Sequence, residues 1–290
     1  MLRELARYHR PGSLREALQL LKQPHTLVLA GGTELLGRSD TITEGVVDLQ
    51  DSGLDYVRAH EDGIRIGAMT RLHAFIGQPS LNVFAGGLLG RAVWASTSNT
   101  ERQAATVGGA LAAGPAESEL LAALLVLDAA VEIQTAESRM LAPAEALLAS
   151  RERYLTPDAI VTEIILPVQP SGAMYSEERV SRTPADRAIV CLAVRLVLRA
   201  GKLCDVRAAA GGAGHTVMRL TAAEAVLEGS TREAARVEDA VRAATSAVSP
   251  PSDHRATSEY RRAMVGVLLA RIVNEVASSA ARGAGRAGHQ

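Results

Sequence analysis

The sequence predicts an α+β protein in two parts, a larger domain over residues 1–170 and a smaller one over residues 171–290. Three observations lead to this prediction. In the first part, strand-like apolar runs alternate with helical segments, and two of the connecting turns contain a glycine pair. Pro167, Pro170 and Gly172 then form the best linker candidate in the chain. Beyond it, strand-like runs come first and helical runs follow, which is typical of a separate α+β domain.

The first part opens with a helix that has a clear start signal. Ser13 is followed by Glu16 three residues later, which is a capping box before an amphipathic stretch over residues 11–22. Apolar runs, some alternating with polar residues, predict strands at residues 26–30, 45–49, 63–67, 130–135 and 159–166. One helix is predicted to begin near Thr33, and others to occupy residues 69–76, 83–98, 120–127 and 142–149. Thr70 is the predicted N-cap of the helix at residues 69–76. Residues 99–103 are a polar segment.

The second part has a different order of elements. Residues 174–179, 188–198 and 203–210 predict a three-stranded antiparallel meander, and residues 220–228, 231–247 and 257–280 predict a bundle of helices. Counted outward from the turn at residues 200–202, Cys204 faces roughly Val197 and Cys191 faces roughly Ala210. A disulfide between the two cysteines is therefore not expected, and we predict buried free thiols.

Composition excludes several classes of function. The 290 residues carry a net charge of -1, so no electrostatic footprint for nucleic acid is expected. Aromatic residues make up 3% of the chain, too few for a base-stacking platform. The longest apolar stretch, at residues 120–131, is interrupted by Asp128 and is too short to cross a bilayer. Because the first residues also lack an apolar signal core, we expect a cytoplasmic protein.

The two glycine pairs are the best candidates for a binding site. Gly31 and Gly32 follow a strand, and glycines allow successive backbone N–H groups to point toward one anion. A helix beginning at Thr33 would add a favourable dipole and a hydroxyl donor. Gly108 and Gly109 follow Thr106 in the same way. One pair alone is as well explained by a plain strand-to-helix turn, but two pairs together could hold a pyrophosphate from both sides.

Other motifs are missing. Neither glycine pair fits the G-x-G-x-x-G dinucleotide fingerprint, Gly201-Lys202 lacks the Ser or Thr of a P-loop, and no G-x-S-x-G elbow is present. The seven histidines and two cysteines show no metal-ligand spacing. A nucleotide-dependent enzyme of another class, such as an NAD-linked dehydrogenase, remains an alternative that the missing fingerprint disfavours.

Seven short motifs together carry a family resemblance. They are YHRP at residues 8–11, LAGGTELL at 29–36, IGAMT at 66–70, TVGG at 106–109, ILP at 165–167, SDHR at 252–255 and EYRR at 259–262. With these motifs the chain resembles, almost end to end, the FAD-binding subunits of the molybdenum hydroxylases, such as the medium subunit of aerobic carbon monoxide dehydrogenase and the flavin segment of xanthine dehydrogenase. The resemblance implies an FAD-binding domain of the PCMH/vanillyl-alcohol-oxidase type followed by a carbon monoxide dehydrogenase flavoprotein C-terminal-like domain.

The resemblance also implies a set of FAD-contacting residues and no catalytic acid or base. Glu119 is expected near ribose or ribityl hydroxyls, Leu166 to use its backbone, and Arg179 to lie near the edge of the flavin ring. The full set of implied cofactor-binding residues is Leu29, Ala30, Gly31, Gly32, Thr33, Glu34, Leu35, Arg102, Thr106, Gly108, Gly109, Ala110, Glu119, Leu166 and Arg179.

The implied function is electron transfer within a complex. Electrons would pass from iron–sulfur clusters through FAD to an external acceptor. Two cysteines cannot hold such clusters, so we expect a molybdopterin-bearing large subunit and a 2Fe-2S small subunit on separate chains, in a heterohexamer. The chain departs from the family at Ala110, where an Asn is usual, and a flavin-free scaffold subunit is therefore the alternative.

Overall fold

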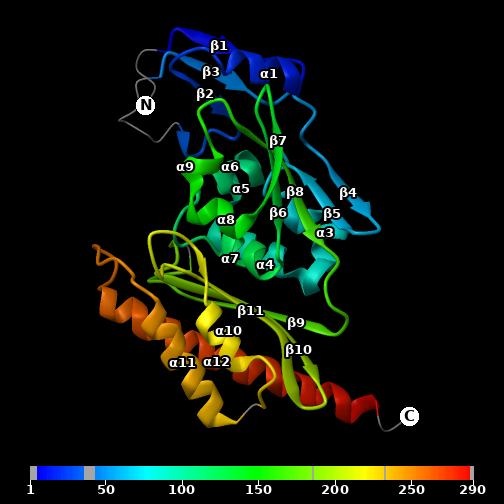
Figure 1. Ribbon diagram of the computed structural model, residues 1–290, viewed down its shortest axis with the longest axis vertical. Coiled ribbons are helices and arrows are strands. Elements are labelled where there is room, and N and C mark those ends of the chain that lie inside the picture. The colour runs from blue at the N-terminus through cyan, green and yellow to red at the C-terminus, as the bar shows by residue number, and fades with distance from the viewer. Residues whose placement is uncertain (1–4, 36–42, 185, 232, 288–290) are drawn as a thin grey trace. The chain divides into compact units, whose positions relative to one another are not determined.

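The computed structural model describes residues 5–35, 43–184, 186–231 and 233–287, with the backbone alone for residues 277–287. The chain forms two compact units that interleave along the sequence (Figure 1). The first unit holds residues 1–78, 97–114 and 128–168, and the second holds residues 79–96, 115–127 and 169–290. The expected domain boundary between residues 170 and 171 stays a prediction.

The first unit contains two sheets. One is parallel, in the order β1 (Arg7–His9), β3 (Gly45–Asp48), β2 (Thr26–Leu29). The other is antiparallel, in the order β4 (Val57–His60), β5 (Gly63–Gly67), β8 (Ile160–Pro167), β6 (Ala130–Gln134), β7 (Arg139–Pro143). The helices described in this unit are α1 (Leu14–Leu20), α2 (Ala74–Gly77), α5 (Asn99–Ala104), α6 (Val107–Ala113), α8 (Ala144–Ala149) and α9 (Arg151–Tyr154).

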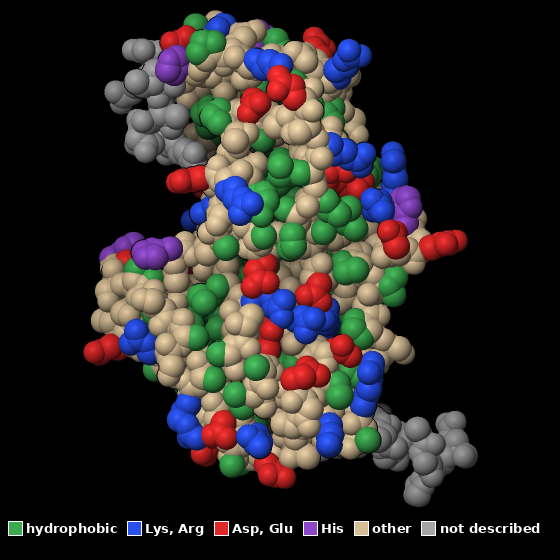
Figure 2. All heavy atoms as spheres, in the orientation of Figure 1, with side chains coloured by type: hydrophobic (Ala, Val, Ile, Leu, Met, Phe, Trp, Pro, Cys, Tyr) green, Lys and Arg blue, Asp and Glu red, His purple; other side chains and the backbone are tan. Residues whose placement is uncertain are grey.

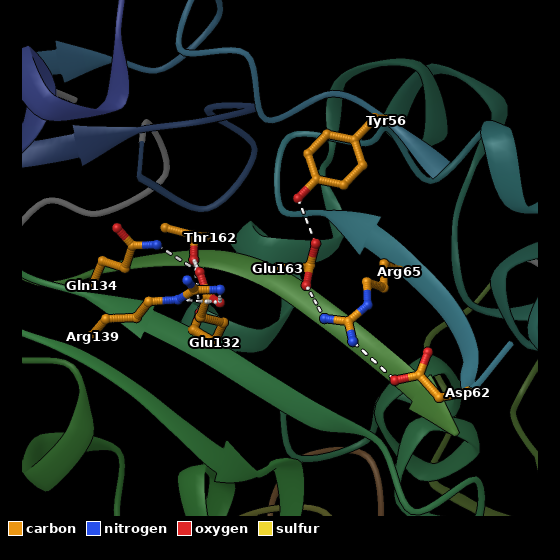
Figure 3. A network of polar contacts seen from close by, with 8 residues as sticks. All are labelled: Tyr56, Asp62, Arg65, Glu132, Gln134, Arg139, Thr162 and Glu163. Carbon is orange, nitrogen blue, oxygen red and sulfur yellow. Dashed lines mark hydrogen bonds and ion pairs between the residues drawn. The ribbon is translucent and has the colours of Figure 1, made fainter. Parts of the chain in front are cut away.

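A polar network ties the strands of the antiparallel sheet together (Figure 3). The register places Glu132 of β6 opposite Glu163 of β8. Arg139 pairs with Glu132, and Arg65 lies 3.2 Å from Glu163, so each carboxylate has its own arginine and the like charges on adjacent strands are balanced. The Tyr56 hydroxyl donates to Glu163 at 2.7 Å, and burial together with this hydrogen bond raises the pKa of Tyr56 to about 12. The phenol therefore remains a donor at neutral pH.

The second unit is built on an antiparallel sheet in the order β12 (Met218–Arg219), β11 (Lys202–Gly211), β10 (Val190–Arg199), β9 (Ala173–Val180). The expectation of three strands is wrong, because the short β12 pairs with β11 as a fourth. Leu192 and Val194 on one face of β10 share a hydrophobic core with the three C-terminal helices, α10 (Thr221–Leu227), α11 (Ala234–Ala247) and α12 (Ser258–Ala287). The unit also contains α3 (Pro79–Val83), the 3₁₀ turn η2 (Phe84–Gly87), α4 (Leu88–Ser96) and α7 (Glu119–Val126).

The cysteines are free, as expected. Cys204 is paired in register with Val197, and Cys191 with Gly211, one residue from the predicted partner. Cys191 is buried, but Cys204 is partly exposed, so the prediction of two buried thiols holds for only one of them.

Two predicted helices are wrong in extent. The helix predicted over residues 69–76 is reduced to α2, and Thr70 does not cap it, because the Thr70 hydroxyl donates to the carbonyl of Tyr56 at 2.9 Å. The helix predicted over residues 83–98 is interrupted at η2, where Ala85 and Gly86 have positive φ angles of 51° and 60°.

Charged side chains of both signs lie next to one another over the face shown in Figure 2, in keeping with the near-zero net charge. Within the described residues, no helix is long and apolar enough to cross a membrane. The same residues contain no group of three or more His, Cys, Asp or Glu side chains that could hold a metal ion.

Candidate cofactor site

A cavity of about 300 Å³ in the first unit brings the two glycine pairs together. This volume lies at the lower end of the range for small-molecule sites. Its walls come from the segment after β2, the start and end of α6, the residues after β5, and the segment that leads into β8. The lining residues are Leu27, Val28, Ala30, Gly31, Gly32, Thr33, Glu34, Leu35, Leu49, Ala68, Met69, Thr106, Gly108, Gly109, Ala112, Ala113, Leu155, Thr156, Pro157, Ala159, Ile160 and Val161.

The first glycine pair requires its glycines. A Cβ added to Gly31 would lie 2.1 Å from the carbonyl oxygen of Ala104, so the backbone can pass there only without a side chain. Gly32 has a φ of 73°, which other residues rarely adopt. Within the described part of the chain, the amides of Gly31, Gly32 and Thr33 donate to no backbone or side-chain acceptor. Three N–H groups in sequence are therefore available to an anion at the edge of the cavity.

The segment after Gly32 differs from the prediction. Thr33 and Glu34 form a turn, and 3₁₀-helical geometry begins at Leu35, two residues after the predicted start. The continuation of the expected helix after Leu35 lies outside the described residues. The described part of the loop offers amides and the Thr33 hydroxyl, and the predicted contribution of a helix dipole stays a prediction.

The second glycine pair lies in the first turn of α6, which the sequence analysis did not predict as a helix. Thr106 is its N-cap, and the Thr106 hydroxyl oxygen accepts the amide of Gly109 at 3.1 Å. Gly108 rests directly on Ala68: its amide donates to the Ala68 carbonyl at 2.9 Å, and an added Cβ would lie 2.6 Å from the Ala68 Cβ. The amides of Val107 and Ala110 donate to the carbonyls of Thr70 and Thr106.

The two glycine pairs therefore contribute differently to the cavity. The amides of the first pair are open, whereas all four amides at residues 107–110 already donate inside the protein. The expectation that both pairs present amides to one anion is thus wrong for the second pair. What α6 offers the cavity is close backbone approach at Gly108 and Gly109, and the hydroxyl of Thr106, which has accepted one hydrogen bond and can still donate its own proton.

These residues fit FAD. Open amides and the hydroxyls of Thr33 and Thr106 suit a diphosphate, and the apolar walls at Leu49, Met69 and Ile160 suit a flat organic ring. Among the described lining residues, Glu34 is the one ionisable group. Binding of a diphosphate would thus depend on backbone dipoles rather than on lysine or arginine side chains in the cavity wall.

Some predicted site residues lie outside the cavity lining. Leu29 ends β2, and Ala110 is within α6. Arg102 is buried on α5 and donates to the carbonyl of Thr97. Leu166 is fully buried in β8, where it pairs with Ile64.

Glu119 and Arg179 belong to the second unit, where they pair with each other. Arg179 Nε lies 3.3 Å from Glu119 Oε1, and the same guanidinium donates to the carbonyls of Ala95 and Asp186. Only 6% of the Glu119 side chain is exposed. Burial raises the pKa of Glu119 to about 7, although its own amide and Arg179 act in the opposite direction.

The raised pKa of Glu119 predicts a pH-dependent stability. In the unfolded chain the carboxyl titrates near its ordinary value, so between about pH 4.5 and 7 the folded state binds more protons, and stability must fall as the pH rises through this window. The shift corresponds to roughly 3 kcal/mol. We expect Glu119→Gln to flatten this part of the profile, measured by urea denaturation between pH 4.5 and 8. A Glu119→Gln profile as steep as that of the wild type would contradict it.

Sequence reasoning missed several cavity residues. Ala68 and Met69 lie in the IGAMT motif, which was used only for the resemblance. The sequence signal was Gly67 at the end of a predicted strand; the structure explains it, because an added Cβ would lie 2.1 Å from the carbonyl oxygen of Leu54. Leu155, Thr156 and Pro157 carried no signal beyond the turn propensity of proline.

Comparison with known proteins gives two family matches. Residues 3–169 match the family described as FAD binding domain in molybdopterin dehydrogenase, and residues 177–276 match the CO dehydrogenase flavoprotein C-terminal domain.

Similar full-length chains were also found. The carbon monoxide dehydrogenase medium chain of Afipia carboxidovorans is 31% identical over 94% of this chain and 97% of its own length. The nicotine 6-hydroxylase medium subunit of Paenarthrobacter nicotinovorans is 30% identical over 93% and 96%. A chain in the structure of reconstituted CO dehydrogenase from Oligotropha carboxidovorans superposes with a TM-score of 0.88 at 29% identity, covering 96% of this chain and 99% of that one.

Proposed function

The chain belongs to the family of FAD-binding subunits of molybdopterin dehydrogenases, and on that premise we propose that it transfers electrons between iron–sulfur clusters of a partner chain and an external acceptor. Its resemblance to medium chains over nearly their whole length makes it the medium, FAD-binding subunit of a molybdenum hydroxylase-type oxidoreductase complex. The partners we propose are a molybdopterin-bearing large subunit and a 2Fe-2S small subunit, in a heterohexamer located in the cytoplasm.

The observation that supports this proposal most strongly is the meeting of both glycine pairs at one cavity. We propose that the amides of Gly31, Gly32 and Thr33 bind the diphosphate of FAD and that the Thr106 hydroxyl donates to it from α6. The cofactor, when bound, supplies the redox chemistry. The chain binds it, orients it and excludes water with the apolar wall. The roles assigned above to Arg102, Ala110, Glu119, Leu166 and Arg179 stay predictions.

Cofactor binding can be tested on the purified chain. Titration with FAD should give saturable quenching of flavin fluorescence, and the protein should be yellow after gel filtration. Equilibrium dialysis with FAD and NAD side by side should show retention of FAD alone. Retention of NAD alone would favour the NAD-linked alternative, and retention of neither would contradict the proposal.

A flavin-free scaffold subunit is the second candidate, and one structural observation favours it. The amides at residues 107–110 are all satisfied without a cofactor. The resemblance adds that the family usually has an Asn, whose side chain could donate, at the position of Ala110. A scaffold subunit would bind no FAD yet co-purify with its partner chains.

Restoring the usual residue at position 110 separates the two candidates. Ala110 does not line the cavity itself but follows Gly109, which does, and the longer side chain of an Asn there could add one or two hydrogen bonds to a bound ligand, worth about 1–3 kcal/mol. We therefore expect Ala110→Asn to tighten FAD binding by roughly one to two decades, measured by fluorescence titration. Ala110→Leu, which adds similar bulk without polar atoms, should not tighten it. Absence of FAD binding in the wild type and in Ala110→Asn alike would favour the scaffold.

A further inference from the structure

Arg151 joins two walls of the cavity that are far apart in the sequence. Its guanidinium Nη1 donates to the carbonyl of Ala113 at 2.8 Å and to that of Gly114 at 2.7 Å. Ala113 lines the cavity at the end of α6. Arg151 itself begins α9, and the segment just after α9, residues 155–157, lines the cavity as well. One side chain thus connects the end of α6 to the start of the opposite wall.

The geometry at Gly114 is adapted to this contact. Gly114 has a φ of 54°, and an added Cβ would lie 1.5 Å from Arg151 Nη1. The guanidinium therefore occupies the space that any side chain at position 114 would take. This contact lies in the stretch Ala112-Ala113-Gly114-Pro115, which has no polar side chain of its own to fix the loop.

Arg151 also affects the electrostatics of the cavity. The last carbonyls of a helix have no partner within the helix and carry its negative pole. Two carbonyls, those of Ala113 and Gly114, accept hydrogen bonds from the guanidinium, which adds a positive charge behind the wall. Because the described lining residues include no lysine or arginine, this charge matters more to an anion than it would in a basic pocket.

We propose that Arg151 is a positioning residue for the cofactor. It holds the end of α6 next to residues 155–157 and offsets the negative charge of the helix end. Both effects raise the affinity of the cavity for the FAD diphosphate. The proposal rests on the proposed function. Arg151 acts through the wall that it holds, since it does not line the cavity itself.

The test compares FAD dissociation constants of the isolated full chain. We expect Arg151→Ala to weaken FAD binding at least tenfold, and Arg151→Lys, which keeps the charge and an N–H donor group, to recover part of the loss. Arg153→Ala is the matched control on the same helix; Arg153 is exposed and stacks on the ring of Tyr154, and its loss should leave the affinity unchanged. Raising the salt concentration should weaken FAD binding more in the wild type than in Arg151→Ala.

The outcomes are distinguishable. If the wild type binds no FAD, the proposed function fails. If the wild type binds FAD and Arg151→Ala binds it equally well, the inference on Arg151 fails while the proposed function stands. Should Arg151→Ala not fold, Arg151→Gln, which has a shorter amide donor and no charge, is compared with Arg151→Lys. Equal affinities would overturn the role of the charge, and a weaker Arg151→Gln would support it.

Discussion

Gly31→Ala should abolish FAD binding at micromolar cofactor concentrations, with a dissociation constant raised at least a hundredfold, or roughly 3 kcal/mol. The added methyl group would overlap the backbone of Ala104, with its Cβ 2.1 Å from the carbonyl oxygen and 2.9 Å from the Cα of Ala105. This overlap can be relieved only by a shift of the backbone, because no flexible side chain is involved. Since Ala105 directly precedes the N-cap Thr106, the shift would separate the two glycine turns. Fluorescence titration with FAD measures the effect.

The matched control for this variant is Gly77→Ala. Gly77 ends α2 in the same unit, and an added Cβ there meets nothing within 4 Å. Gly77→Ala should bind FAD as the wild type does. Wild-type affinity in Gly31→Ala would mean that the first glycine turn does not hold the cofactor.

Arg261→Ala should destabilise the second unit by roughly 3 kcal/mol, because a fully buried side chain and the hydrogen bonds that it donates are lost. Arg261 is 1% exposed and donates to both carboxylate oxygens of Asp253, at 2.9 and 2.8 Å, and to the carbonyl of Ile189. Burial alone would raise the pKa of Asp253, but hydrogen bonds from Arg261 and two backbone amides hold it well below its usual range. Without Arg261, the Asp253 carboxylate, whose side chain is 28% exposed, loses a bidentate partner, and the Ile189 carbonyl loses a donor.

Urea denaturation followed by far-UV circular dichroism measures the effect. The midpoint should fall with an unchanged slope. Arg262→Ala is the neighbouring control, because no described residue pairs with Arg262, and its midpoint should shift little. Equal midpoints for Arg261→Ala and the wild type would show that the pair contributes no net stability.

Local signals predicted the elements that depend on local chemistry. The Ser13 hydroxyl accepts the amide of Glu16 at the start of α1, as the capping box indicated, although the Glu16 carboxylate returns to Gly12. The long strands β8, β10 and β11 lie where apolar runs placed them. The meeting of the two glycine pairs was predicted from their shared character and is confirmed by the common cavity.

Two of the errors have tertiary causes. Thr70 was predicted as an N-cap, but its hydroxyl donates to the carbonyl of Tyr56. No local sequence pattern reveals that partner. Residues 99–103, for which only polarity was noted, belong to α5 with Ser98 as N-cap, a local signal that was overlooked. Arg151 gave no signal at all, because its partners at residues 113 and 114 are remote in sequence.

The interleaving of the units has a consequence for dissecting this protein. Helix α7 lies within the part of the sequence matched by the FAD-binding family, yet it packs against β10 and β11, and its Leu121 and Leu124 are fully buried. A fragment truncated after residue 170 would expose these leucines to water. We expect such a fragment to aggregate on expression. Truncation at the family boundary should therefore not yield an FAD-binding domain that folds on its own.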